Sequence, residues 1–549
     1  MPNRYRKAAA AYLASEMSAT DIFKDASVRL LKKAIPSVVP KLRLPMLWRL
    51  KWSAARALRS DINYSWTETA KLPEIARALR RQDPRAIRAA SDLMAKYLSI
   101  EPSPRIAIEL AELQRLSNRH DAANQTLRRA VRKWPADRNL WYHAIIYLMR
   151  HGEPHEVSEL LDTILKVDPD YALARFFKKL TSLYPDFVRS IMGVVSASEV
   201  STKPAYLIGF AVWGRRYLHL FLNYTLASLL ADGNLPAASQ SHDVHIVVFA
   251  TFREAEFIRS SPIFDRVSEF ARFHFVAYDE ALLEIAKSDD HGVAVHARFG
   301  LMSAGHHAIA ECARRLRCKA TILGADNVVN GDFLQNVIKL ADARGGASAI
   351  VCPGIRLPAR ALEVVSRFYR GDQGEVAISG KAFAHLLSEF MPAECFADST
   401  DFSRFPLFLC WRVGDEGLLI HANHPHPVMI DGRYLREIWF PSIDPIDGRF
   451  LVRNCTDLAR IHICSTSEIC LFDAADNPLL LPSQPMRRFD ADEVGLWLWQ
   501  FSDGLRERYF AQPVRYPFND VVSTRWAPIE RDAAAKVKQI LDSMHSLKS

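Results

Sequence analysis

The stretch Cys318-Lys-Ala-Thr-Ile-Leu-Gly-Ala-Asp326-Asn327 is an apolar run that ends on a carboxylate and a carboxamide. An uninterrupted apolar run of this kind is typical of a strand buried on both faces, as in parallel sheets. Open α/β sheets bind ligands outside the carboxyl ends of their strands. The stretch therefore predicts an α/β fold with a ligand site that includes Asp326 and Asn327.

Apolar runs and helical patterns alternate around this stretch. We expect strands at 206–213, 244–250, 273–278, 320–325 and 348–352, and helices at 221–230, 293–316, 333–343 and 359–368. This alternation predicts a mostly parallel sheet with helices on both faces. Beyond Pro406, short apolar runs at 418–421, 428–430, 451–452 and 461–464 predict a mixed sheet with loops over one edge. We assign residues 204–490 to this α/β domain, and 491–549 to a covering tail with a charged helix at 529–547.

An internal repeat precedes the α/β domain, in residues 76–185. Pro135 and Pro169 lie 34 positions apart, and each follows a helical run. Small or apolar residues recur at equal distances before each proline, which are 123, 127 and 130 before the first and 157, 161 and 164 before the second. Such spacing lets antiparallel helices pack closely, and Trp141 opens the second unit. The segment resembles tetratricopeptide (TPR) repeats and predicts about three helical hairpins. An ordinary helical bundle is the alternative.

Residues 1–75 form a basic, helical segment. Residues 1–60 hold 13 Lys and Arg against three acids, whereas the whole chain of 549 residues has a formal net charge of +9. A solvated helix pair and a segment drawn to anionic lipid both fit this charge. With the surplus confined to one arm and without a basic sheet motif interleaved with aromatic residues, we expect no nucleic-acid partner.

The chain carries no pattern of secretion or of membrane insertion. Its amino-terminal apolar stretch soon meets Glu16, unlike a signal peptide. No run approaches the roughly 20 apolar residues that cross a bilayer. The eight cysteines, all from Cys312 onward, form no Cys-x-x-Cys pair, so we expect free thiols. These features predict a cytoplasmic protein, with peripheral contact at the cytoplasmic face of the inner membrane as an open possibility.

Two motifs carry a resemblance that covers about half the chain. The first strand ends in Val212-Trp213-Gly214 and leads to Leu226-Ala-Ser-Leu-Leu-Ala-Asp-Gly-Asn234-Leu-Pro236. The segment Ile322-Leu-Gly-Ala-Asp326-Asn-Val-Val-Asn-Gly331-Asp332 stands where an Asp-x-Asp motif is expected. Together they resemble the GT-A-type glycosyltransferase domains that bacterial proteins often fuse to TPRs. The resemblance implies a nucleotide-sugar donor and a Mn²⁺ or Mg²⁺ cofactor.

The metal and nucleotide ligands follow from this resemblance and from charge. Divalent cations of this class prefer oxygen ligands at rigid positions, and imidazole also binds Mn²⁺. Asp326 with His424 or His426 would hold the metal, although Asn327 and Val328 replace the second acid of the motif, and Asp332 could compensate. The expected nucleotide-sugar site is formed by Trp213, Gly214, Arg298, Asp326, Asn327 and Arg356.

Each of these residues also has an ordinary structural explanation. Asp326 could cap the following helix, Trp213 could lie in the core, and the two histidines could be plain loop residues.

An inverting transferase needs a general base for the acceptor hydroxyl. We select Asp444 and Asp447, in a Gly- and Pro-rich loop, over Asp415 and Glu416.

These inferences point to a glycosyltransferase that moves a sugar from a nucleotide donor to a saccharide, a lipid-linked or a protein acceptor. The TPR segment would bind the acceptor or a protein partner. The alternative is a non-catalytic TPR scaffold whose α/β domain has lost its chemistry, because the Asp-Asn-Val sequence departs from the motif.

Overall fold

The computed structural model describes residues 84–546, apart from 101, 118, 197–200, 344–345, 400–401, 404–406, 439–441, 476–484, 487–488, 500–503 and 521. The chain divides into two compact units, Met1–Tyr64 and Ser65–Ser549. All described residues belong to the second unit, so the predicted basic segment 1–75 lies outside them. Among the described helices, none combines the length and apolar character needed to cross a membrane.

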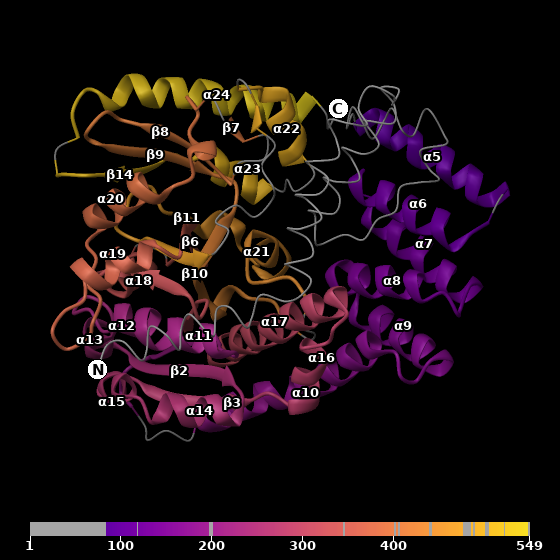
Figure 1. Ribbon diagram of the computed structural model, residues 1–549, viewed down its shortest axis with the longest axis horizontal. Coiled ribbons are helices and arrows are strands. Elements are labelled where there is room, and N and C mark those ends of the chain that lie inside the picture. Colours follow the sequence, from indigo (N-terminus) through magenta and orange to yellow (C-terminus); the bar gives the residue numbers. More distant parts are fainter. Residues whose placement is uncertain are drawn as a thin grey trace, which may run out of the picture. The chain divides into compact units, whose positions relative to one another are not determined.

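A row of antiparallel helices opens the described part of the chain (Figure 1). The helices are α5 (Pro84–Ile100), α6 (Pro104–Leu116), α7 (His120–Lys133), α8 (Arg138–His151), α9 (Pro154–Val167) and α10 (Ala172–Ser196). The six positions that repeat at an interval of 34 are all buried: Ala123, Leu127, Ala130, Val157, Leu161 and Ile164. Trp141 is also buried and packs edge-on against Tyr171, with ring centroids 5.1 Å apart. The predicted helical-repeat region is confirmed.

The last repeat helix joins the repeats to the α/β domain. Helix α10 packs along the long helix α17 (His291–Leu316). At the crossing, a Cβ atom on Gly300 would lie 3.0 Å from the rings of Phe176 and Phe177, so glycine favours this close approach. Farther along, Arg453 donates to the carbonyls of Arg150 and Gly152 at the end of α8. The repeats are therefore packed directly onto the α/β domain.

The main sheet is mixed and has nine strands within the described residues. They are β1 (Ala205–Ala211), β2 (Asp243–Ala250), β3 (Arg272–Ala277), β4 (Lys319–Ile322), β5 (Asn327–Val329), β6 (Ala349–Pro358), β10 (Pro425–Asp431), β11 (Ile461–Ile463) and β12 (Leu471–Ala475). The order is β3-β2-β1-β4-β10-β6-β12-β5, with β11 also pairing with β6. Strands β3, β2, β1 and β4 are parallel as predicted, but β10 runs antiparallel between β4 and β6.

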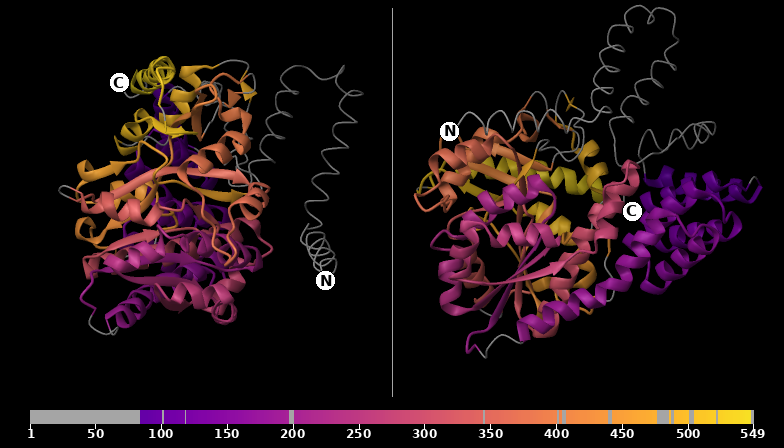
Figure 2. Two further views of the ribbon diagram at one scale, coloured as in Figure 1. Left: turned by 90° about the vertical axis from the view of Figure 1, so that its left-hand side faces the viewer. Right: turned by 60° about the horizontal axis from the view of Figure 1, so that its bottom comes forward.

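Helices cover both faces of the sheet, as predicted (Figure 2). Helix α17 packs on β1, β4 and β10. The other face carries α11 (Arg215–Leu220), the π-helix η3 (Phe221–Thr225), α12 (Leu226–Leu229), α13 (Leu235–Ser241) and α18 (Phe333–Asp342). The outer connections are α14 (Phe252–Arg259), α15 (Pro262–Ser268), α16 (Glu280–Ala286), α19 (Ala361–Phe368) and α20 (Gly380–Phe390).

The antiparallel direction of β10 is set by the point at which the chain enters the main sheet. A smaller sheet of β8 (Phe408–Arg412), β9 (Gly417–Ala422) and β14 (Val514–Pro517) lies beside the main sheet, and β7 (Phe402–Ser403) pairs with β13 (Pro485–Met486). The chain leaves β9 and enters β10 after only Asn423 and His424. The chain thus enters the main sheet at the edge where the parallel strands end, and β10 must run in the opposite direction to them. The apolar pair at 451–452, expected in a strand, lies instead in α21 (Gly448–Asn454).

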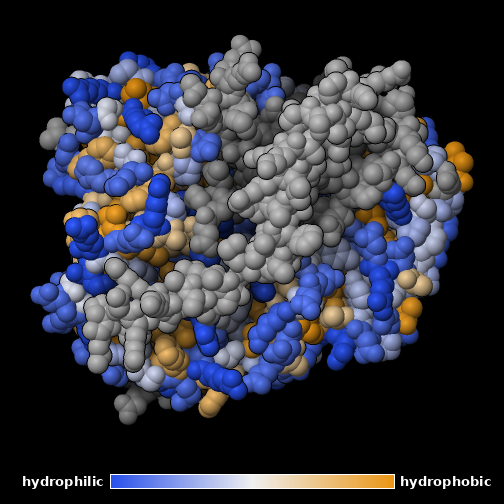
Figure 3. Space-filling view, in the orientation of Figure 1, coloured by the Kyte–Doolittle hydropathy of each residue, from blue (hydrophilic) through white to orange (hydrophobic). Residues whose placement is uncertain are grey.

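The carboxyl-terminal tail covers the smaller sheet and closes a second core. Helices α22 (Ala491–Trp499), α23 (Gly504–Ala511) and α24 (Trp526–Ser546) supply much of it. Met94 of α5 and Leu113 of α6 join the same core, which links the first repeat helices to the tail. All eight cysteines are buried free thiols. Among the coloured residues in Figure 3, hydrophilic ones predominate, with apolar residues between them.

Candidate functional site

The candidate site lies at the carboxyl ends of β1, β4, β6 and β12. The strand order reverses between β1 and β4, because β2 and β3 continue on one side of β1 and β4 lies on the other. Trp213 follows the end of β1, and Asp326 follows the end of β4. A reversal of this kind opens a crevice in which α/β sheets bind ligands. The sequence placed Trp213, Gly214, Asp326 and Asn327 at this edge, and the structure agrees.

Strand register places three polar residues in a row beside Asp326. Asp473 of β12 is aligned with Arg356 of β6 on one side and with Asn327 of β5 on the other. The Asn327 amide donates to the Asp473 carboxylate, and the Arg356 Nε lies 3.7 Å from the other Asp473 oxygen. Asn327 also accepts a hydrogen bond from the Gly324 N–H at 2.6 Å. The row therefore fixes Asp473 next to the Asp326 turn.

The two carboxylates repel each other. Burial raises the pKa of Asp326 to about 7, and the nearby charge of Asp473 adds to this rise, whereas Arg356 and Arg216 oppose it. Burial also raises the pKa of Asp473, while Arg356 and the hydrogen bond from Asn327 lower it. Two adjacent acids cannot both ionise easily, so the pair retains a proton close to neutral pH unless a cation joins it.

The helix after β1 adds a cation and a phenol. Gly214 has φ of 82°, in the left-handed region where a side chain is strained, and it begins α11. The sharp turn brings Arg216 and Tyr217 towards the acids. Burial raises the pKa of Tyr217, with further increase from Asp326 and an opposing effect of Arg216. Tyr217 is nevertheless 43% exposed, so it lines an open surface.

A π-helical turn connects this helix to the acidic strand end. In η3, the Thr225 hydroxyl donates to the Ala325 carbonyl at 2.9 Å, immediately before Asp326. The π turn η3 lies between the two α-helical segments α11 and α12. Such π turns occur often at functional sites because they shift side chains out of the regular helical register.

His424 and His426 approach the same centre from β10. Strand β10 runs antiparallel to β4 and β6, so its first residues lie at the edge of the sheet where those two strands end. Burial lowers the pKa of His426 to about 4, and the charge of Arg356 lowers it further. Burial lowers the pKa of His424 to about 3, with contributions from Arg506, His426 and Arg356. Arg356 thus stands between the acid pair and the histidines.

Several predicted site residues are engaged elsewhere. Arg298 lies on the exposed side of α17, where its Nε donates to the Ala286 carbonyl at 2.9 Å. Asp332 begins α18 beside Gly233. Asp444 lies 3.4 Å from both Arg150 and Arg449 in ion pairs. The structure brings none of these three next to Asp326.

Asp447 lies closer to the centre but has its own partners. It begins α21, where one carboxylate oxygen accepts hydrogen bonds from the N–H groups of Arg449 and Phe450. The other oxygen lies 3.3 Å from Arg506. Its negative charge nonetheless acts on His426, where it favours the protonated ring.

Sequence reasoning missed Asp473, Arg216 and Tyr217. A usable signal existed for Asp473, because the apolar run Ile469-Cys-Leu-Phe472 ends on an acid, as the run before Asp326 does. Arg216 and Tyr217 carried no such signal. Their approach to the acids depends on the turn at Gly214.

The acid pair fits a divalent cation that also binds phosphate. Mg²⁺ commonly binds one or two protein carboxylates and takes its other ligands from water and substrate phosphates. Asp326 and Asp473 offer two carboxylates whose repulsion a cation would relieve. No group of three or more His, Cys, Asp or Glu within the described ranges could hold a metal by itself. The predicted set of Asp326, His424 and His426 stays a prediction, and Asp473 is the better placed second acid.

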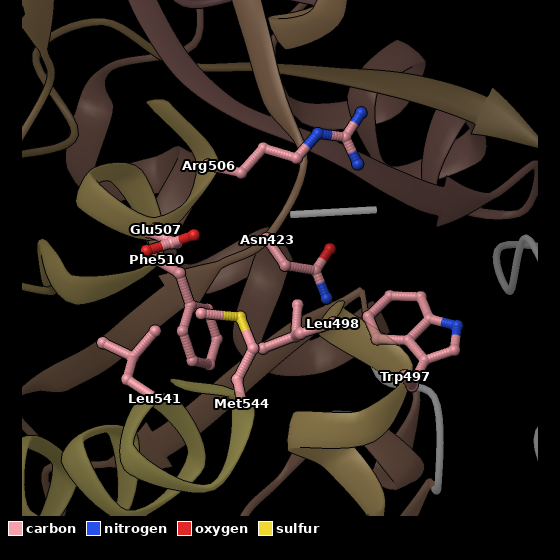
Figure 4. Close-up of a pocket in the computed structure, with 8 residues that line it drawn as sticks. All are labelled: Asn423, Trp497, Leu498, Arg506, Glu507, Phe510, Leu541 and Met544. Carbon is pink, nitrogen blue, oxygen red and sulfur yellow. The ribbon is translucent and has the colours of Figure 1, made fainter. Parts of the chain in front are cut away.

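A pocket adjoins the histidine segment (Figure 4). Its lining residues are Asn423, Trp497, Leu498, Arg506, Glu507, Phe510, Leu541 and Met544. Asn423 directly precedes His424, and Arg506 pairs with Asp447. The pocket therefore lies beside His424 and Asp447. Its apolar wall comes from the carboxyl-terminal helices and consists of Trp497, Leu498, Phe510, Leu541 and Met544.

Comparison with known proteins gives little guidance. No family model matches the chain, and no curated protein matches it. Among solved structures, a mutant of the O-GlcNAc transferase of Thermobaculum terrenum is similar, with 18% identity and a TM-score of 0.16. The match covers 40% of this chain and 43% of that one, so it spans less than half of the solved chain. A TM-score of this size does not establish a shared fold.

Proposed function

We propose that the protein is a glycosyltransferase that uses a nucleotide-sugar donor. The observation that carries this proposal is the grouping of Asp326, Asp473, Arg356 and Arg216, which act on one another electrostatically beside the strand ends of the main sheet. Two carboxylates and two guanidinium groups at the strand ends suit a diphosphate and the divalent cation that it binds. Arginine pairs with phosphate oxygens through a planar fork, and the acids hold the metal.

The chemistry follows from the charge that the reaction creates. When the sugar–phosphate bond breaks, negative charge accumulates on the nucleoside diphosphate. A bound Mg²⁺ or Mn²⁺ would stabilise that charge, and Asp326 with Asp473 would hold it. Arg356 and Arg216 would bind the phosphate oxygens and keep them aligned. Trp213, packed edge-on against Tyr278 at 5.6 Å, would stack against the nucleotide on the β1 side.

The acceptor side of the proposal rests on the packing of the repeats. The repeats contact α17 and the segment of 442–453, which also reaches the site through Asp447. We propose that this fixed helical surface binds the acceptor, which would be a saccharide, a lipid-linked saccharide or a protein. The basic segment 1–75 would add peripheral membrane contact if the acceptor is lipid-linked.

Thermal unfolding with UDP-, GDP-, CMP- and dTDP-sugars, each with and without Mn²⁺, tests the donor site. A ligand at about 100 times its dissociation constant adds about 2.7 kcal/mol to the free energy of unfolding. We expect Tm to rise by several degrees with one nucleotide class, and only when metal is present, because phosphate and acids share the cation. EDTA should abolish the rise.

The opposite result would favour another function. If no nucleotide shifts Tm with any metal, the donor site is refuted. The protein would then be a helical-repeat scaffold in which the Arg356–Asp473 ion pair only stabilises the fold.

A further inference from the structure

A cluster of basic and aromatic side chains lies where the repeats meet the α/β domain. His120 begins α7 and His151 ends α8, and their half-buried rings stack with centroids 4.3 Å apart. The His120 Nδ1 shares a hydrogen bond of 2.9 Å with the Tyr147 hydroxyl. Arg449 of α21, in the α/β domain, acts electrostatically on all three rings. We call these four residues, together with Arg150 of α8, the junction cluster.

Two guanidinium groups of the junction cluster share a single carboxylate. The Nε of Arg150 and the Nη1 of Arg449 each lie 3.4 Å from an oxygen of Asp444. A tight bond between these groups is about 2.7–2.9 Å long, so both contacts are loose. Each guanidinium has about five N–H donors, and Asp444 is its sole side-chain partner among the described residues. The two arginine side chains are 42% and 37% exposed, so most of these donors are open to a ligand.

The two imidazole rings also present unused nitrogens. These are the Nε2 of His120 and both ring nitrogens of His151. Within the described part of the chain they have no hydrogen-bond partner, and they are not among the buried atoms that lack one. They are therefore accessible from solvent. When the Tyr147 hydroxyl donates to the Nδ1 of His120, the Nε2 carries the ring proton and can donate it outward.

The electrostatic environment of these rings is positive. Burial lowers the pKa of His151 to about 2, and the neighbouring ring and three arginines lower it further. The arginines are Arg115, Arg150 and Arg449. Burial, Arg449 and Arg115 also lower the pKa of His120, whereas Asp121 opposes them. Guanidinium groups thus outweigh the nearby acids around two uncharged rings, and such a place attracts an anion.

We propose that the junction cluster binds a phosphate monoester. A phosphate brings three acceptor oxygens and a charge of about −1.5 to −2 near neutral pH. A carboxylate would bring no more charge than Asp444 already supplies. Arg150 and Arg449 would bind the phosphate oxygens, and the two imidazoles would donate to them from the side of the repeats. This site is separate from the proposed donor site and needs no metal ion.

Titration calorimetry of the full chain tests the site, with EDTA present because the proposed donor site depends on a metal ion. The probes are glucose 1-phosphate and octyl phosphate at constant ionic strength, since the ester could be a sugar phosphate or a lipid phosphate. We expect one of them to bind in the unsubstituted protein, and the tighter one identifies the source. Arg449→Gln should weaken this binding by about 10–100-fold, the contribution of a hydrogen bond to a charged group. The Tm of the ligand-free variant shows whether its fold is retained.

Asp444→Asn should change the affinity in the opposite direction. It removes the carboxylate that competes with the ligand for both guanidinium groups, so binding should tighten by about 2–10-fold, the contribution of two partly exposed ion pairs. Arg132→Gln is the matched control, because it removes an exposed arginine of the same repeats that pairs with Glu159 instead. It should leave the affinity unchanged.

Three results would overturn the proposal. The first is that neither ester binds to the unsubstituted protein. The second is that Arg449→Gln binds the ester as tightly as Arg132→Gln does. The third is that Asp444→Asn binds it no more tightly than the unsubstituted protein, which would show that the two guanidinium groups do not meet the phosphate.

Discussion

Asp326→Asn is expected to abolish the metal-dependent Tm shift with nucleotide sugars, and to raise Tm of the ligand-free protein at pH 8. The first effect follows because an amide is a poor ligand for a hard divalent cation. The second follows because the substitution removes the cost of burying a charged carboxylate, and with it the repulsion from Asp473. Loss of function with a gain of stability is the usual sign that a site holds like charges together for binding.

The raised pKa of Asp326 makes the free energy of unfolding depend on pH. The pKa of Asp326 rises from its ordinary 3.8 to about 7 in the folded protein. Between these values the folded state binds more protons than the unfolded state. The free energy of unfolding therefore decreases as pH rises from about 4 to about 7, and stays lower above that range. Asp326→Asn should flatten this part of the profile, which Tm measured from pH 5 to pH 8 would show.

Two further variants make the result specific. Asp473→Asn should also abolish the metal-dependent Tm shift, but without the gain of stability, because it removes the carboxylate that pairs with Arg356 and accepts the Asn327 amide. Asp332→Asn is the control, since Asp332 begins α18 away from the pair. Unaltered nucleotide binding by Asp326→Asn, or equal loss with Asp332→Asn, would contradict the assignment.

Gly432→Ala is expected to give the largest loss of stability. Gly432 begins the short helix η5 (Gly432–Tyr434) at the end of β10, and its N–H donates to the Cys318 carbonyl at 2.9 Å. A Cβ atom there would lie 2.6 Å from the Arg314 N and closer still to the Ala313 carbonyl group. These are backbone atoms in the last turn of α17, which cannot rotate aside as a side chain can.

The cost should be at the upper end for an overpacked site, about 3 kcal/mol, because α17 and the end of β10 must separate. Tm measured by calorimetry should fall by about 3 °C, because the shift for a given free energy decreases with the size of the unit that unfolds. Gly193→Ala is the matched control, because it is the same change at an exposed position in α10 with nothing within 4 Å. It should stabilise the helix by about 0.5–1 kcal/mol. Equal Tm for the two variants would show that α17 and β10 do not pack as described.

The repeat region was accessible to sequence reasoning because its packing is local. Each helix contacts the next one along the chain, so spacing alone selects the buried positions. Ala123, Leu127 and Ala130 and their counterparts 34 residues later are all buried. The strands of the first half were also predictable, because each buried strand of a parallel sheet is one apolar run.

The second half of the sheet was harder to predict. Strand β10 has apolar residues like its neighbours, and nothing in its composition gives its direction. Its antiparallel course depends on the smaller sheet, from which the chain enters after two residues. The segment around Leu451 is short enough to suit either a strand or a helix, and the Asp447 cap selects the helix α21.

Sequence by itself determined the helical repeats, the α/β class, and the strand ends that carry Trp213, Asp326 and Asn327, since each rests on a pattern within a few residues. Only the tertiary structure decided which groups meet there. Asp473 is brought to Asp326 by the pairing of β12 with β5 and β6, from about 150 residues away along the chain. His426 reaches Arg356 because β10 runs antiparallel to β6. Such pairings depend on contacts across the whole sheet, which leave no local pattern in the sequence.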